Sequence, residues 1–164
     1  MVYRESYKVQ SRDRAVSFHD VTDRVKEIAA KSGIKDGIVV VYSHHTTCSV
    51  ITQECAFDMS MTGLETLQQD LVNVFEDICP TCRYEGMYLH PGPEAIAFAA
   101  DHDEDRFGCH NTDAHLRSSI IGRNVTIVMA DGEMDLGEFG RIHFIDWDQT
   151  RARQRTVQVM VIGE

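Results

Sequence analysis

The feature that most constrains the fold is a run of β-branched and aromatic residues, Ile38–Tyr42. Such residues favour extended strands, and an uninterrupted apolar run is typical of a strand that is covered on both faces. The pair Asp36-Gly37, which comes directly before the run, supplies a turn. The sequence therefore predicts a central, doubly covered strand over 38–42.

The remaining patterns predict further strands and a few helices. Apolar residues recur with helical spacing over Asp23–Ser32, with Thr22 as the N-cap and Gly33 as the stop. The pair Asp131-Gly132 between two apolar runs predicts a hairpin. We expect other strands over 3–11, 48–52, 124–129, 141–147 and 156–162, and helices over 57–78, 94–100 and 112–121. Because the helices gather in the first two-thirds of the chain, we expect an α+β fold.

Length and composition limit the class of protein. The 164 residues predict a single domain over 1–164, and a hydrophobic share of 43% is enough for a core. A formal net charge of −10 argues against a nucleic-acid partner, because binding the phosphate backbone needs a basic face. We expect no membrane partner and no secretory signal, since long apolar segments are missing and the N-terminus is polar. Five cysteines, an odd number, favour a reducing, cytoplasmic location.

Two short motifs allow more than one interpretation. Cys79-Pro80-Thr81-Cys82 is a lone C-x-x-C without the second pair that structural zinc sites usually have. Arg151, Arg153 and Arg155 alternate, so a strand would place all three on one side. The arginines fit a solvated edge strand protected against aggregation, which we take as the default. The alternative is a site that binds the phosphate group of a small molecule.

Histidines are concentrated in two polar segments. His44 and His45 follow the predicted central strand, whereas His102, His110 and His115 lie together later in the chain. Neutral imidazole is the commonest metal ligand in proteins and also transfers protons near neutral pH. In an extended segment His44 and His45 face opposite ways, so only one of them serves a given site. The clustering predicts a metal or acid–base site.

The ordered motifs of the chain resemble the YjbQ family, which is labelled secondary thiamine-phosphate synthase. The matching segments, in chain order, are His45–Glu54, Asn111–Leu116, Ser118–Gly122, Asp131-Gly132, Leu136-Gly137 and Arg155–Val157. The resemblance covers nearly the whole chain. It implies an α+β fold with a mixed, barrel-like sheet, helices packed against that sheet, and assembly as a homotrimer.

The same resemblance implies a metal site. His45 matches the histidine before the family's threonine pair, and His115 matches the histidine before a leucine. His102 matches a third histidine that opens the polar segment. The resemblance therefore implies a divalent metal, most naturally zinc, held by these three side chains. The alternatives for one of the ligands are His44, His110 and Cys109.

Carboxylates near these histidines are the candidates for catalysis. Three imidazoles leave one position open on a tetrahedral zinc, where a bound water has a pKa near neutrality. Glu54 matches an acidic position of the family and is the candidate for proton transfer. Asp113 is the candidate for orienting the second ring nitrogen of a ligand. Asn111, Asp101 and Asp103 are alternatives for that role.

We therefore expect a small metalloenzyme that acts on a small, phosphorylated substrate. It would be a transferase resembling thiamine-phosphate synthase, or a metal-dependent hydrolase or lyase. Diphosphate chemistry normally uses magnesium with oxygen ligands, whereas three histidines suit zinc, so the histidines argue against the reaction in the family label. One alternative is a noncatalytic trimer that binds a metal or ligand. Another is that the histidines hold the subunits together at a trimer interface.

Overall fold

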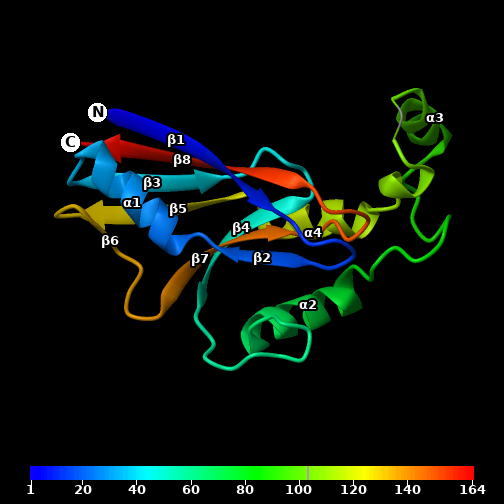
Figure 1. The fold of residues 1–164 in the computed structure, drawn as a ribbon, viewed down its shortest axis with the longest axis horizontal. Coiled ribbons are helices and arrows are strands. Elements are labelled where there is room, and N and C mark those ends of the chain that lie inside the picture. Colours follow the sequence, from blue (N-terminus) through cyan, green and yellow to red (C-terminus); the bar gives the residue numbers. More distant parts are fainter. Residues whose placement is uncertain (103) are drawn as a thin grey trace.

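The computed structural model describes residues 1–102 and 104–164 and contains two β-sheets (Figure 1). The first sheet contains, in spatial order, β1 (Val2–Gln10), β8 (Gln154–Gly163), β3 (Gly37–Tyr42), β5 (Asn124–Ala130) and β6 (Glu133–Met134). The second contains β2 (Ser17–Asp20), β7 (Gly140–Asp146) and β4 (Cys48–Glu54). The helices are α1 (Thr22–Ser32), α2 (Thr66–Ile78), α3 (Pro93–Asp101), the 3-10 helix η1 (Arg106–Cys109) and α4 (Thr112–Ile121).

The predicted α+β class is confirmed, with one correction to the sheet. The sheet was expected to be mixed, but each strand pairing in the described part of the chain is antiparallel. The chain can use hairpins and longer connections here because antiparallel neighbours need no helical crossover. In Figure 1 the strands curl around a common interior, in agreement with the expected barrel-like form.

The main core lies between the two sheets. Val39 and Val41 of β3 and Phe144 of β7 are completely buried in it. Val25 and Ile28 of α1 are also fully buried there, so α1 closes the space between the sheets on one side. The apolar stripe of α1 was evident from the sequence, and Gly33 ends the helix with φ 69°, as predicted.

The strand β3 is central, as predicted, but only one of its faces is covered. It pairs with β8 on one side and β5 on the other. Val39 and Val41 face the core, whereas Ile38 on the opposite face is 36% exposed. The expectation of a doubly covered strand was wrong, because Ile38 and its neighbours Val128 and Ile162 on the outer face are 36%, 60% and 38% exposed.

A second, smaller core lies on the other side of the β2-β7-β4 sheet. Trp147 and Ile145 pack there against Phe75 of α2 and Ala114 of α4. The guanidinium of Arg117, on α4, lies over the Trp147 ring with a distance of 5.6 Å to the centroid. This second core attaches α2 and α4 to the sheet.

The predicted helices occur, with one large difference in length. The expected N-cap was wrong for α1: Val21 is the N-cap, and the Thr22 hydroxyl accepts from the Ile142 N–H instead. The helix expected over 57–78 begins only at Thr66, because Glu65 and Gln68 form a capping box that starts it. The helix over 112–121 is confirmed, and the expected helix near 94–100 is α3. The Asp131-Gly132 hairpin is confirmed, with φ values of 53° and 85° that suit a tight primed turn.

Several loops and strand ends meet at one end of the molecule. The loop after β3 leads into β4, whose first residue, Cys48, lies opposite Asp146 at the end of β7. The Ser118 hydroxyl on α4 donates to the Cys48 carbonyl at 2.6 Å, which places α4 beside the start of β4. The segment that leads into β8 lies at this end as well. No helix in the described residues is long and apolar enough to span a membrane.

Candidate functional site

A cavity of about 630 Å³ at this end of the molecule collects the histidines and arginines. The loop after β3 contributes His44 and His45, and α4 contributes His115. The segment that leads into β8 contributes Arg151 and Arg153, and β8 itself contributes Arg155. These are the three arginines that the sequence placed on one side of a strand. The full set of charged or imidazole side chains in the lining is His44, His45, His90, His115, Arg151, Arg153, Arg155, Glu104 and Asp148.

Arg155 forms the floor of this cavity and is held there by hydrogen bonds. Its Nε donates to Asp146 Oδ2 at 2.6 Å, and its Nη2 donates to Asp146 Oδ1 at 3.2 Å and to Thr47 Oγ1 at 3.2 Å. Asp148 Oδ2 lies 3.6 Å from the same Nη2 and also accepts from Asn111 Nδ2 at 3.2 Å. Burial alone would lower the pKa of Arg155, but the hydrogen bond and charge of Asp146 raise it. The charge of Arg155 is therefore neutralised by the buried carboxylates of Asp146 and Asp148.

This arrangement corrects the default interpretation of the arginine run. β8 is not an edge strand, because it pairs with β1 on one side and β3 on the other. Arg151 and Arg153, which precede β8, are 27% and 33% exposed and point into the cavity lining. The alternation therefore directs the arginines to the cavity instead of protecting an exposed edge.

His45 is held as a neutral imidazole. Its Nε2 accepts a hydrogen bond from the Thr156 backbone N–H at 2.9 Å. Burial, followed by the nearby His44 and Arg155 groups, lowers the pKa of His45 to about 4. Because Nε2 acts as the acceptor, the proton of the neutral ring is on Nδ1. At neutral pH His45 is thus an N–H donor and a poor base.

His115 is arranged differently. Burial and then the neighbouring His90 lower the pKa of His115, while a hydrogen bond to the Thr46 backbone opposes this effect. A backbone hydrogen bond that favours the protonated ring goes to a carbonyl, so one ring nitrogen donates and the other carries the lone pair. The rings of His90 and His115 are nearly perpendicular, with centroids 5.7 Å apart. His115, unlike His45, therefore has a ring nitrogen that is suited to accept a proton.

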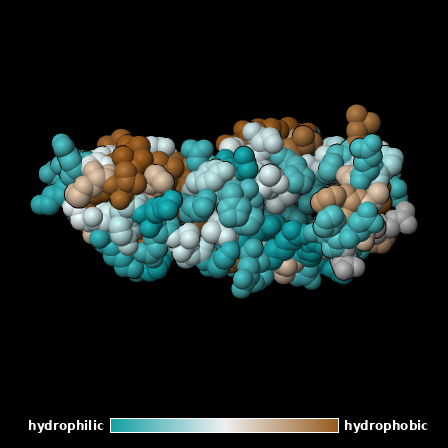
Figure 2. Space-filling model, turned by 90° about the horizontal axis from the view of Figure 1, so that it is seen from above, coloured by the Kyte–Doolittle hydropathy of each residue, from teal (hydrophilic) through white to brown (hydrophobic). Residues whose placement is uncertain are grey.

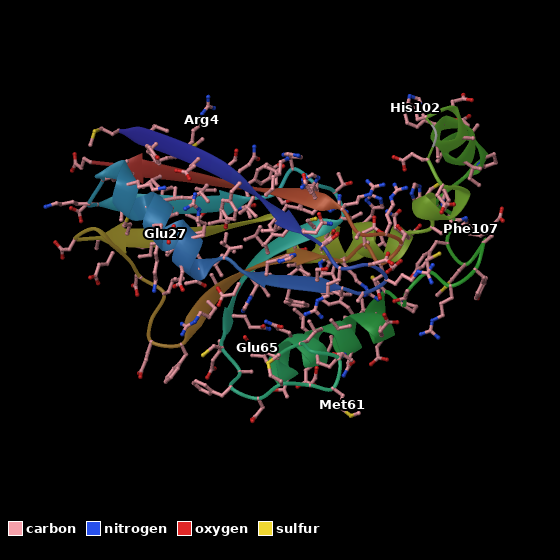
Figure 3. All side chains as sticks on the ribbon, in the orientation of Figure 1. Arg4, Glu27, Met61, Glu65, His102 and Phe107 are labelled. Atoms are coloured by element: carbon pink, nitrogen blue, oxygen red, sulfur yellow. The ribbon has the colours of Figure 1, made fainter. Side chains whose placement is uncertain are left out.

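The structure does not bring His102 into this group. The side chain is exposed, its ring stacks on Phe98 with 3.9 Å between centroids, and its Nδ1 lies 2.7 Å from the Phe98 carbonyl. Figure 3 shows His102 at the outer end of α3, away from the sheets. His90, which the sequence did not single out, lies beside His115 instead. Its place in the long Pro- and Gly-containing loop before α3 was the available signal.

Glu54 lies at the opposite end of β4 from the histidines. It lines a separate cavity of about 550 Å³ together with Asp135 and Glu138. The strand β4 runs from Cys48 to Glu54, which separates the two ends by roughly 20 Å at 3.3 Å per residue. Within one subunit, Glu54 therefore does not reach the histidine cavity.

Asp113 has a structural environment. Its Oδ1 accepts from the Cys82 backbone N–H at 3.1 Å, and its Oδ2 lies 4.0 Å from Arg117 Nη2. Burial raises the pKa of Asp113, and the Cys82 N–H and Arg117 oppose the shift. Arg117 is fully buried and donates to Glu76 Oε1 at 2.7 Å, so it is not available to grip a phosphate. Asp113 therefore attaches the segment after α2 to α4.

The three proposed metal ligands do not fit a zinc site in the described chain. Among the described residues no group of three His, Cys, Asp or Glu side chains has a metal-binding arrangement. His45 uses Nε2 for the Thr156 N–H, and His102 lies outside the cavity lining. Of the alternatives, His44 and Cys109 line the main cavity, whereas His110 lines a smaller one beside Cys82. Asp103 lies outside the described residues.

The fold and the cavity define a class: a small α+β protein with two antiparallel sheets and a histidine–arginine cavity at one end. The family model "UPF0047 protein YjbQ-like" matches residues 5–164, and the chain belongs to this YjbQ family. A UPF0047 protein of Archaeoglobus fulgidus is 28% identical over 147 residues, which cover 90% of this chain and 94% of the relative. A UPF0047 protein of Methanocaldococcus jannaschii is 28% identical over 160 residues, covering 98% and 94%.

Solved structures agree with the fold. A YbjQ-like protein of unknown function from Sulfolobus solfataricus has a TM-score of 0.78 at 22% identity, with 100% of this chain and 99% of that chain covered. A hypothetical protein from Aeropyrum pernix has a TM-score of 0.71 at 26% identity, with 99% of each chain covered. These likenesses support the fold along the whole chain.

Proposed function

We propose that the chain binds a small phosphorylated molecule in the histidine–arginine cavity and performs acid–base chemistry on it. The observation that carries the proposal is the convergence of His115 and His45 with Arg151 and Arg153 on one cavity. Guanidinium groups bind phosphate oxygens through charge-assisted hydrogen bonds, and imidazoles transfer protons near neutral pH. A volume of about 630 Å³ suits a small ligand.

The two cavity imidazoles have different roles in this proposal. His115 accepts or returns the substrate proton, because its free ring nitrogen carries the lone pair and burial lowers its pKa. His45 donates from Nδ1 to a substrate oxygen, because Nε2 is held by the Thr156 N–H. Neither role requires a metal.

A turnover assay tests the roles proposed for His115 and His45. It measures the release of phosphate, diphosphate or the remaining organic product from a panel of phosphorylated small molecules, which includes thiamine-phosphate precursors. We expect His115→Gln to lose at least about 100-fold in turnover, the usual contribution of a general base. His102→Gln is the matched control and keeps wild-type turnover, since this ring is outside the cavity. Equal turnover in wild type and His115→Gln would remove His115 from the mechanism.

A transferase of the thiamine-phosphate type is one reaction within this proposal. Its substrates carry phosphate groups, which the arginines favour. The alternative is a noncatalytic ligand-binding trimer. It is distinguished by binding of a phosphorylated ligand without turnover in either wild type or His115→Gln.

We propose the homotrimer as the assembled form. In register across the first sheet lie four apolar side chains on its uncovered face: Val2, Ile162, Ile38 and Val128, which are 66%, 38%, 36% and 60% exposed. Figure 2 shows several hydrophobic patches toward one long side of the molecule, separated by hydrophilic residues. An apolar strip of this kind is typical of an interface.

We also propose a cytoplasmic location. The five cysteines form no disulfide, although Cys79 and Cys82 are separated by only two residues. Reduced thiols at this spacing are favoured in a reducing compartment.

A further inference from the structure

The carboxylate of Glu104 forms ion pairs with two arginines of the cavity, Arg151 and Arg153. Its Oε2 lies 2.5 Å from Arg151 Nη2 and 3.4 Å from Arg153 Nη2. A single oxygen is thus shared by two guanidinium groups. The Glu104 backbone N–H donates to the Ala99 carbonyl at 2.9 Å, which fixes this residue at the end of α3.

The remaining arginine does not compete for this carboxylate. Arg155 is 5% exposed and is neutralised by Asp146 and Asp148, at 2.6 Å and 3.6 Å. Arg151 and Arg153 are therefore the guanidinium groups that a ligand can reach. Glu104 holds both of them.

The guanidinium of Arg151 lies against Gly108 of η1. A Cβ atom on Gly108 would lie 2.6 Å from Arg151 Nη1 and 3.0 Å from Arg151 Cζ. The guanidinium therefore lies directly against the Gly108 backbone, and a larger residue at this position would move the flexible end of Arg151. The arginine is thus seated between the Gly108 backbone and the Glu104 carboxylate.

We propose that Arg151 and Arg153 form the anion subsite of the cavity, and that Glu104 is a built-in competitor which the phosphate group of the ligand displaces. This inference rests on the proposed function and adds to it the charge class of the ligand and a means of selection. The Glu104 carboxylate stands where an oxygen of the ligand's phosphate binds.

The competitor selects ligands by charge. A carboxylate on the same chain has an effective concentration in the millimolar range or above, so a free monocarboxylate does not displace it. A phosphomonoester carries a charge near −2 and offers three acceptor oxygens to the two guanidinium groups, and a diphosphate offers more of both. The ligand is therefore a phosphomonoester or diphosphate, and a simple carboxylic acid is excluded.

The test is calorimetric titration of the full chain with inorganic pyrophosphate. Wild type is compared with Glu104→Gln, which keeps the side-chain shape and removes the charge. The Glu104 side chain is 44% exposed, so its ion pairs with the arginines are weak. Removing its charge therefore raises the affinity for pyrophosphate only modestly. We expect Glu104→Gln to bind pyrophosphate roughly three- to fivefold more tightly than wild type, the upper part of the range for partly exposed ion pairs.

Matched variants identify the cause of the gain. Glu94→Gln makes the same charge change on the exposed start of α3, outside the cavity lining, and stays within about twofold of wild type. Adding Arg153→Gln to Glu104→Gln abolishes the gain. Acetate produces no binding heat with wild type. Glu104→Ala also removes the carboxylate and, like Glu104→Gln, binds pyrophosphate more tightly than wild type.

The possible results separate this inference from the proposed function. Pyrophosphate binding of equal strength in wild type, Glu104→Gln and Glu94→Gln would overturn the competitor role and leave the anion-binding cavity intact. Weaker binding in Glu104→Gln and Glu104→Ala would also overturn it. Absence of binding in wild type and in both Glu104 variants would overturn the cavity's proposed ligand class as well.

Discussion

Replacing Arg155 by methionine tests how the floor of the cavity is built. Arg155 and Asp146 are 5% and 0% exposed, and two hydrogen bonds of 2.6 Å and 3.2 Å join them. Methionine retains much of the arginine stem but removes the guanidinium. Asp146 then remains buried without its cation.

The expected destabilisation follows from this burial. Breaking a buried ion pair by removing one partner costs about 3–5 kcal/mol, because the remaining charge is uncompensated. For a chain of 164 residues, at roughly 2–4 °C per kcal/mol, the melting temperature falls by about 6–20 °C. Arg151→Met is the matched control, since its pair with Glu104 is partly exposed and contributes at most about 1 kcal/mol.

The assay is urea unfolding of the wild type, both single variants and the double variant Arg155→Met/Asp146→Leu. We expect the double variant to recover part of the loss, because the unpaired Asp146 carboxylate is gone. Asp148 also loses Arg155 but still accepts hydrogen bonds from Asn111 and Thr150. A cost of less than about 1 kcal/mol for Arg155→Met, equal to that of Arg151→Met, would refute the reasoning.

Three further predictions concern single side chains. Burial and neighbouring charges lower the pKa of His45 to about 4, so the folded protein favours the neutral ring. The contribution of His45 to stability is therefore complete above pH 6.5, the pKa of the unfolded chain, and is lost as the pH falls toward 4. Allowing for solvent screening, we expect a loss of about 1–2 kcal/mol that is missing in His45→Gln, measured by unfolding at each pH. His102→Ala leaves the pyrophosphate affinity measured by calorimetry unchanged; a weaker affinity would restore His102 to the site. If the proposed homotrimer is held by the apolar strip, Val128→Glu shifts the mass measured by light scattering from trimer to monomer. A trimer mass that is unchanged would exclude the strip as the interface.

Much of the fold was accessible from local patterns. The stripe of α1 and its Gly33 stop, and the Asp131-Gly132 turn, depend on neighbouring residues only. The start of α2 was misplaced because apolar residues continue upstream of the Glu65 capping box, and periodicity alone does not detect a cap. The uncovered face of β3 was missed for another reason. An apolar run has the same composition whether a helix or a second subunit covers it.

The site was only partly predictable because it is assembled across the chain. The clustering of histidines indicated the correct region, and His45 and His115 do line one cavity. The choice of His102 failed as a spatial neighbour, because the end of α3 turns this ring onto Phe98. The role of Arg155 depends on Asp146 from another strand, a pairing that sequence spacing does not reveal.

The most direct test of the central claim is an NMR titration of the His115 ring with and without saturating pyrophosphate. In the free protein burial and His90 hold the pKa of His115 below its ordinary value of 6.5. A bound anion in the same cavity favours the imidazolium, so we expect this pKa to rise on addition of pyrophosphate while the His102 resonances stay in place. A His115 titration curve that is identical with and without the ligand would contradict the account.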